Sequence, residues 1–202
     1  MKQGLMIVIS GPAGSGKGTV NAHLLATGEF AYSVSATTRA PREGEIDGVN
    51  YHFITKEDFI TRIEAGEMLE YTEYCGNFYG TPKKEAEEVL ASGKNLILEI
   101  EVEGARNVKA RYPSAILILL LPPSFATQEA RLRGRHSEPE EKILERLART
   151  REELRFADQY DYVVYNHDGC DREAADEIRA ILTAERAAMH RNEGVAERYF
   201  AD

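Results

Sequence analysis

Cysteine is scarce in this sequence of 202 residues, and long apolar runs are missing from it. The two cysteines, Cys75 and Cys170, exclude a disulfide framework and a cysteine-based zinc site. A helix that crosses a bilayer needs about 20 apolar residues in succession. The short apolar part of residues 1–10 is followed by glycine-rich sequence without a cleavage site, which disfavours a signal peptide. We therefore expect reduced thiols in a cytoplasmic protein that has no membrane partner.

Basic residues are also fewer than acidic residues. The chain has 25 Lys and Arg against 34 Asp and Glu, so its formal net charge is −9. Broad nucleic-acid binding requires a basic surface, and we expect no nucleic-acid partner. The 43% of hydrophobic and 29% of charged residues are typical of a globular domain that buries an apolar core. We find no internal repeat and no low-complexity tract in the sequence.

Apolar runs alternate with helical patterns along most of the chain. Short continuous apolar runs predict strands that are buried on both faces, and they occur at residues 5–9, 96–100, 115–121 and 162–165. Helical periodicity occurs between and after them, at residues 17–25, 102–111, 125–132, 140–157 and 172–189. Strands separated by helices predict an α/β fold with a parallel sheet.

Two segments interrupt this alternation. Residues 32–88 are rich in glycine and tyrosine, and we expect an inserted lobe of short antiparallel strands with one helix at residues 56–65. Residues 126–145 contain a basic and then an acidic stretch, which predicts a mobile lid. The core then consists of residues 1–31, 89–125 and 146–202, all within a single domain.

A glycine-rich loop lies between the first predicted strand and the first predicted helix. Its residues are Gly11, Pro12, Ala13, Gly14, Ser15, Gly16, Lys17, Gly18 and Thr19. Glycines let several backbone N–H groups point at one anion, and the helix N-terminus adds partial positive charge. The terminal lysine reaches the β- and γ-phosphates, so the context predicts a P-loop for a nucleoside triphosphate. Because glycine follows the lysine, we expect Thr19 or water to make the usual hydroxyl contact with Mg²⁺.

A second phosphate site is indicated further along the chain. Arg39 and Arg42 are three residues apart, and arginine forks bind phosphate bidentately. Hydroxyl groups that can donate to the same oxygens belong to Ser35, Thr37, Thr38, Tyr51 and Tyr79. A solvated polar loop remains the alternative reading of this segment.

Three motifs together resemble the guanylate kinase family. They are S-x-T-T-R-x-P-R at residues 35–42, V-N-Y-H-F at residues 49–53 and N-x-Y-G-T at residues 77–81. The resemblance extends from the P-loop to Asn166. It implies a P-loop nucleoside monophosphate kinase, with a parallel-sheet core, a GMP-binding lobe and a helical lid. The implied reaction transfers the γ-phosphoryl group of ATP to GMP or dGMP, with Mg²⁺ as cofactor.

The resemblance also assigns roles to individual residues by position. It implies GMP contacts for Ser35, Arg39, Arg42, Tyr51, Glu70, Tyr79, Thr81 and Glu101. The Glu70 carboxylate would accept from the guanine N1–H and N2 amino group. Where the family has L-D-I-D-x-Q-G, residues 98–104 read L-E-I-E-V-E-G, so two aspartates and a glutamine are replaced by glutamate. Thr19 and Glu99 are the candidate metal contacts, directly or through water.

Arginines gather in the predicted lid and the helix after it. Phosphoryl transfer depends on positioning and on stabilising the charge of the transferring oxygens. The resemblance implies catalytic roles for Lys17, Arg42, Arg135 and Arg146, and ATP contacts for Arg131 and Asn166. We expect Arg133, Arg149 and Arg151 to pair with neighbouring glutamates, as is usual on an acidic helix.

Two other functions stay open at this point. One is another small-molecule kinase on the same scaffold, which would not need Glu70 or the tyrosines. The other is a non-catalytic guanylate kinase-like module that binds proteins. Such modules typically degrade the P-loop and sit beside other interaction domains, whereas Lys17 and its loop are intact here. The oligomeric state is not indicated by the sequence.

Overall fold

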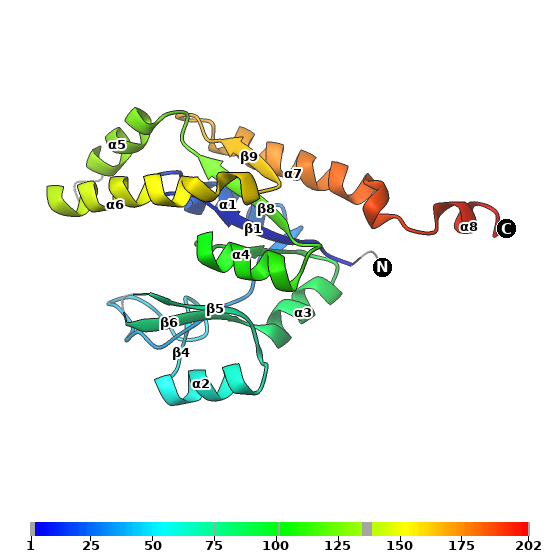
Figure 1. Ribbon diagram of the computed structural model, residues 1–202, viewed down its shortest axis with the longest axis horizontal. Coiled ribbons are helices and arrows are strands. Elements are labelled where there is room, and N and C mark those ends of the chain that lie inside the picture. The colour runs from blue at the N-terminus through cyan, green and yellow to red at the C-terminus, as the bar shows by residue number, and fades with distance from the viewer. Residues whose placement is uncertain (1–2, 75, 101, 135–138, 202) are drawn as a thin grey trace.

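A parallel sheet forms the centre of the protein, as a computed structural model shows for residues 3–74, 76–100, 102–134 and 139–201 (Figure 1). Within these residues five strands are arranged in the order β2-β7-β1-β8-β9, and each neighbouring pair is parallel. Their bounds are β1 (Met6–Ser10), β2 (Phe30–Tyr32), β7 (Asn95–Leu98), β8 (Ile116–Leu121) and β9 (Tyr162–Tyr165). The expected α/β fold with a parallel sheet is therefore confirmed.

Helices cover both faces of this sheet. On one face α1 (Lys17–Ala26) and α7 (Asp171–Ala187) pack against Ile7 and Ile9 of β1. On the other face α3 (Lys83–Ala91) and α4 (Val102–Arg111) pack with Met6 and Val8 of the same strand. Successive side chains of a strand point to opposite faces. A strand between two helical layers must therefore be apolar at every position, which explains the continuous apolar runs.

A second, smaller sheet lies below the core in Figure 1 and is formed by the segment expected as an inserted lobe. Among the described residues its strands have the order β4-β3-β6-β5. Their bounds are β3 (Ala36–Thr37), β4 (His52–Phe53), β5 (Met68–Tyr74) and β6 (Asn77–Pro82), and α2 (Lys56–Glu64) covers them. The β5–β6 and β3–β6 pairs are antiparallel as expected, whereas β3 and β4 are parallel.

The predicted elements agree with the structure to within two residues at most ends, and three differences are informative. The predicted strand 96–100 ends at Leu98, so Glu99 leaves the sheet at its carboxyl end. The helix predicted over 140–157 is α6 (Glu140–Glu153), followed by the 3₁₀ helix η1 (Leu154–Gln159). Helix α3 was not expected at all, and it crosses the predicted lobe boundary at residue 88.

Helix α5 (Phe125–Gly134) packs against α6 beside the glycine-rich loop. Leu132 of α5 contacts Ile143 and Leu147 of α6, and Ala13 of the loop packs against this small cluster. The predicted lid at residues 126–145 includes most of α5 and the start of α6, so its described part is in direct contact with the predicted triphosphate loop.

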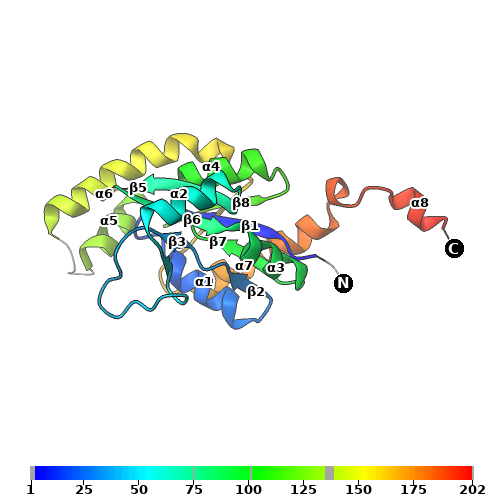
Figure 2. The same cartoon turned by 90° about the horizontal axis from the view of Figure 1, so that it is seen from below.

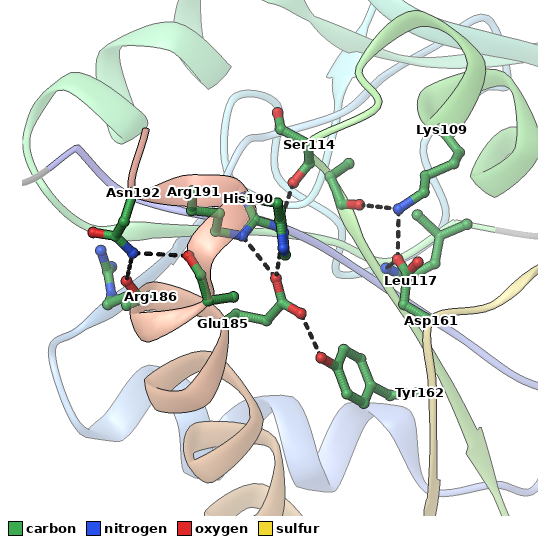
Figure 3. A network of polar contacts seen from close by, with 12 residues as sticks. Lys109, Ser114, Leu117, Asp161, Tyr162, Glu185, Arg186, His190, Arg191 and Asn192 are labelled. Atoms are coloured by element: carbon green, nitrogen blue, oxygen red, sulfur yellow. Dashed lines mark hydrogen bonds and ion pairs between the residues drawn. The ribbon is translucent and has the colours of Figure 1, made fainter. Parts of the chain in front are cut away.

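A polar network connects the residues after α7 to α7 itself and to β9 (Figure 3). Glu185 of α7 accepts hydrogen bonds from the Tyr162 hydroxyl and from Nε of Arg191, the latter at 2.7 Å. Beyond η2 (Met189–Arg191), α8 (Val195–Tyr199) extends away from the body of the protein (Figures 1 and 2). None of the described helices is long and apolar enough to cross a membrane.

Candidate active site

The glycine-rich loop connects the end of β1 to the start of α1. Gly14 and Gly16 have φ angles of 86° and 88°, a left-handed conformation that glycine adopts without strain. A Cβ on Gly16 would lie 2.2 Å from Nδ2 of Asn166, so a larger residue there would displace the Asn166 side chain. The first turn of α1, which is described throughout, contains no acidic side chain that would compete for an anion. Lys17 Nζ donates to the carbonyl of Gly11 at 2.6 Å, which holds the ammonium group against the loop.

Two polar side chains fix this loop from the side of β9 and α5. Nδ2 of Asn166, just after β9, donates to the carbonyl of Ser15 at 3.0 Å. Arg131 of α5 donates to the carbonyl of Asn166 at 2.8 Å and to that of Gly14 at 3.3 Å. It also forms an ion pair with Asp168 at 2.7 Å. Both residues that we expected to contact ATP therefore lie directly beside the P-loop backbone.

One cleft of about 470 Å³ opens between the core and the smaller sheet. Predicted site residues that line it are Gly11, Ala13, Lys17, Ser35, Tyr51, Glu70, Tyr79, Glu99 and Arg146. They come from elements far apart in the sequence, and the fold brings them to one space. Predicted residues outside its described lining are Pro12, Gly14, Ser15, Gly16, Gly18, Thr19, Arg39, Arg42, Thr81, Arg131 and Asn166.

Glu70, at 4% exposure, is the most buried carboxylate among the described residues that line this cleft. Its Oε1 accepts from the hydroxyl of Thr81 at 2.7 Å. Burial raises the pKa of the Glu70 carboxyl, and hydrogen bonds from the side chain and backbone of Thr81 oppose that shift. A Cβ on Gly104 would lie 3.4 Å from Oε2 of Glu70, so the glycine leaves room on that side. A buried acceptor of this kind fits a ligand that offers adjacent donors.

Glu99 lies at the carboxyl end of β7, where ligands bind in open α/β sheets. Its Oε2 accepts from Nδ2 of Asn21 at 2.9 Å and from the hydroxyl of Tyr32 at 3.3 Å. Burial, together with the negative charge of Glu99, raises the pKa of the Tyr32 phenol well above its ordinary value. Tyr32 is therefore protonated at neutral pH.

The predicted phosphate arginines lie outside the described lining of the cleft, and Arg39 lies beside Tyr51, which lines it. The Arg39 guanidinium is 5.7 Å from the ring centroid of Tyr51, and the rings of Tyr51 and Tyr79 are 6.1 Å apart. Nη2 of Arg39 pairs with Oε1 of Glu45 at 2.9 Å. The other oxygen of Glu45 accepts from the backbone N–H of Arg42 at 2.7 Å. Glu45, which sequence reasoning missed, thus orders the loop that contains both arginines.

Two hydroxyls expected at the second phosphate site have structural partners instead. Oγ1 of Thr37 donates to the carbonyl of Phe78 at 3.0 Å, and Oγ1 of Thr38 accepts from the Phe78 N–H at 2.9 Å. They extend the pairing of β3 with β6. Of the three hydroxyls before Arg39, Ser35 is the one that lines the cleft.

Helix α6 contributes a polar face that sequence reasoning recognised only in part. The residues of α6 that line the cleft are Lys142, Glu145, Arg146, Arg149 and Glu153. Their spacing of three or four residues places them on one face of the helix, which was the available signal. Arg149 pairs with Glu153 at 3.1 Å and Arg133 with Glu129 at 2.9 Å, as expected. Arg151 lies instead over the ring of Phe125, at 5.4 Å from its centroid.

Known proteins resemble this chain over nearly its whole length. Residues 3–185 match the guanylate kinase family. A guanylate kinase from Halalkalibacterium halodurans is 50% identical over 191 residues, which span 94% of this chain and 93% of the relative. One from Desulfitobacterium hafniense is 45% identical, with 93% and 94% of the two chains covered. The chain belongs to the guanylate kinase family.

A solved structure of the family also shares the fold. The crystal structure of guanylate kinase from Anaplasma phagocytophilum matches with a TM-score of 0.76 at 33% identity, covering 98% of this chain and 94% of the other. The resemblance inferred from the motifs is therefore confirmed. Two predicted site residues, Arg135 and Glu101, lie outside the described residues.

The metal site expected in a guanylate kinase can be tested against the donors of the cleft. Among the described residues no group of three or more His, Cys, Asp or Glu side chains could hold an ion. Mg²⁺ in kinases keeps several waters and is bound by one or two carboxylates together with substrate phosphates. Glu99, which lines the same cleft as Lys17, fits that donor set. Thr19 is exposed in the first turn of α1.

Proposed function

We propose that this chain is a guanylate kinase that transfers the γ-phosphoryl group of ATP to GMP and to dGMP. The observation that carries this proposal is the position of Glu70, a buried carboxylate that faces the same cleft as the P-loop lysine. The cleft would therefore bind a triphosphate at the loop that contains Lys17 and guanine at Glu70. Membership of the guanylate kinase family agrees with this assignment.

ATP is proposed to bind along the P-loop. The N–H groups of residues 11–19 would surround its phosphates, and Lys17 would leave the Gly11 carbonyl to contact the β- and γ-phosphates. Arg131 and Asn166 would stabilise the loop through its carbonyls, and the adenosine would extend on their side of the loop. Strain-free positive φ angles at Gly14 and Gly16 support the required backbone conformation.

GMP is proposed to bind against the smaller sheet. Its phosphate would contact Arg39, Arg42, Tyr51 and Tyr79, and its base would contact Glu70. Ser35 and Thr81 would complete recognition of the base, as would Glu101. Guanine presents N1–H and the N2 amino group side by side, and an ionised carboxylate offers two acceptors. Adenine would place an acceptor against the same carboxylate, which leaves a desolvated charge unpaired.

Transfer is proposed to follow closure of three parts, the core, the GMP-binding lobe at residues 32–88 and the lid at residues 126–145. Closure excludes water and brings the two nucleotides into line. The attacking group is already a phosphate oxygen, so no general base is needed. Lys17, Arg42, Arg135 and Arg146 would spread the charge of the transferring group. Mg²⁺ bound with ATP would add positive charge on the phosphates, near Glu99 and, directly or through water, Thr19.

A panel of nucleoside monophosphates tests this proposal. ADP formation is followed by a coupled assay with GMP, dGMP, AMP, CMP and UMP as acceptors. A site that hydrogen-bonds a substrate group rejects analogues without it by about 10⁴-fold, so kcat/KM for GMP should exceed that for AMP by this order. Comparable activity with AMP would contradict the assignment of GMP and would leave a broader monophosphate kinase.

A further inference from the structure

Glu99 stands where the family motif noted above has an aspartate, because residues 98–101 read L-E-I-E instead of L-D-I-D. The additional methylene extends the reach of the carboxylate and adds a rotatable bond. A longer side chain has more conformations to lose when it is ordered. A glutamate that serves at this position therefore needs contacts that select one orientation.

Two side chains in the structure make such contacts. Nδ2 of Asn21 donates to Oε2 of Glu99 at 2.9 Å, and the hydroxyl of Tyr32 lies 3.3 Å from the same oxygen. Asn21 is completely buried, whereas Tyr32 is 37% exposed. A carboxylate can only accept hydrogen bonds, so the amide nitrogen of Asn21 must face it. Neither contact uses the second oxygen, Oε1.

The fold explains why these three residues meet. Tyr32 ends β2, Glu99 follows β7 and Asn21 lies in α1, which follows β1. The strands are adjacent in the order β2-β7-β1, so their carboxyl ends lie side by side. Asn21 is also four residues after Lys17, which puts both on one face of α1. The cluster is therefore continuous with the P-loop lysine.

The chemistry of the two donors suits an electrostatic role for Glu99. An amide and a phenol are neutral, so they orient the carboxylate without cancelling its charge. A lysine or arginine in either place would form an ion pair and reduce the charge that Glu99 presents to the cleft.

We propose that Asn21 and Tyr32 are positioning residues that hold the Glu99 carboxylate at the phosphate end of the cleft, with Oε1 directed to the magnesium-bearing triphosphate. The inference rests on the proposed function, because the nucleotide is the ligand that Glu99 faces. It explains how this chain accommodates glutamate where aspartate is expected. Asn21 makes the shorter contact from a buried position and contributes the larger share.

Nucleotide binding to the full chain tests this inference without turnover. Isothermal titration calorimetry measures the affinity for ATP with Mg²⁺ and with EDTA, and the ratio of the two is the magnesium preference. Loss of one hydrogen bond to a charged group should lower this preference about tenfold in Asn21→Leu and about threefold in Tyr32→Phe. Glu99→Ala should lower it further, and adding Asn21→Leu to Glu99→Ala should change nothing more. The KM for GMP should stay within about twofold in both single variants.

A matched control removes the same kind of contact elsewhere. Tyr162→Phe deletes a tyrosine hydroxyl that donates to Glu185, far along the chain from the P-loop (Figure 3). It should keep the full magnesium preference. Tyr32→Phe retains its ring and supplies the test if Asn21→Leu does not fold, as judged by thermal unfolding.

Three results would overturn the inference. They are a full magnesium preference in folded Asn21→Leu and Tyr32→Phe, full additivity of Asn21→Leu with Glu99→Ala, and no magnesium preference in the unmodified chain. Failure of the proposed function would appear differently, as a chain that binds MgATP but does not consume it in the presence of GMP.

Discussion

Replacing Glu70 by glutamine tests base recognition with minimal change in shape. Oε1 of Glu70 accepts from Thr81 at 2.7 Å, and a glutamine would keep its oxygen on that side. Its NH₂ group would then face the cleft, where guanine also presents donors. One charged hydrogen bond is lost and one acceptor is replaced by a donor, which costs about 3 kcal/mol. We expect kcat/KM for GMP to fall about 100-fold, because each 1.4 kcal/mol corresponds to a factor of ten.

The same substitution should not harm the fold. Burial raises the pKa of Glu70 in the folded state, so the contribution of this group to stability is complete below its unfolded pKa. That contribution is lost as the pH rises through the folded pKa. At pH 7.5 the neutral amide avoids the free-energy cost of burying an ionised carboxylate. The Tm of Glu70→Gln should therefore equal or exceed that of the unmodified chain. The advantage should shrink near pH 4, around the ordinary pKa of glutamate.

The assay measures steady-state kinetics with GMP and AMP, and thermal unfolding at both pH values. Activity with AMP should change by less than about threefold, because AMP does not use the lost acceptors. An equal loss with both nucleotides would refute the base-recognition role. A large drop in Tm at pH 7.5 would refute the energetic reasoning.

Further expected outcomes concern catalysis, closure and stability. Lys17→Ala should lower kcat by at least about 10²-fold with the fold retained, as steady-state kinetics and circular dichroism would show; near-normal turnover would contradict the role of Lys17. Hydrogen exchange of residues 32–88 and 126–145 should slow when GMP and a non-hydrolysable ATP analogue are added together, and unchanged protection would exclude closure. Glu185 is 8% exposed, and although burial acts to raise its pKa, hydrogen bonds from Tyr162 and Arg191 lower it overall. Glu185→Ala should therefore reduce the free energy of unfolding by about 2 kcal/mol at pH 7 in urea titrations. This loss of stability should disappear as the pH falls through the folded pKa of Glu185. A loss that does not depend on pH would argue against a stabilising role for the ionised carboxylate.

Much of the core could be predicted from the sequence, because strands buried on both faces appear as continuous apolar runs. Residues 116–120 of β8 are all buried, and the run Ile116–Leu121 is apolar throughout. Strands β2 and β3 have three and two residues, which is too short for any periodicity to appear. Helix α3 begins directly after β6, with Pro82 as its N-cap, so no loop separates the two elements. Its apolar face is set by contact with the core.

The site was predictable where the backbone itself forms it, and less so where distant segments meet. The P-loop is one continuous segment, and its glycines are required by local conformation at Gly14 and Gly16. The pairing of Asn21 with Glu99 joins residues 78 positions apart. Only the strand order brings them together. Glu45 was missed for a related reason, since its role depends on a turn that folds back onto the two arginines.

The central claim is that the chain moves a phosphoryl group from ATP to GMP. The most direct measurement incubates the purified protein with Mg²⁺, GMP and ATP labelled in its γ-phosphoryl group, and then separates the nucleotides. The account predicts that the label appears in the β-position of GDP, and that AMP in place of GMP gives little labelled product. Label that remains in ATP, or that is released only as inorganic phosphate, would contradict it.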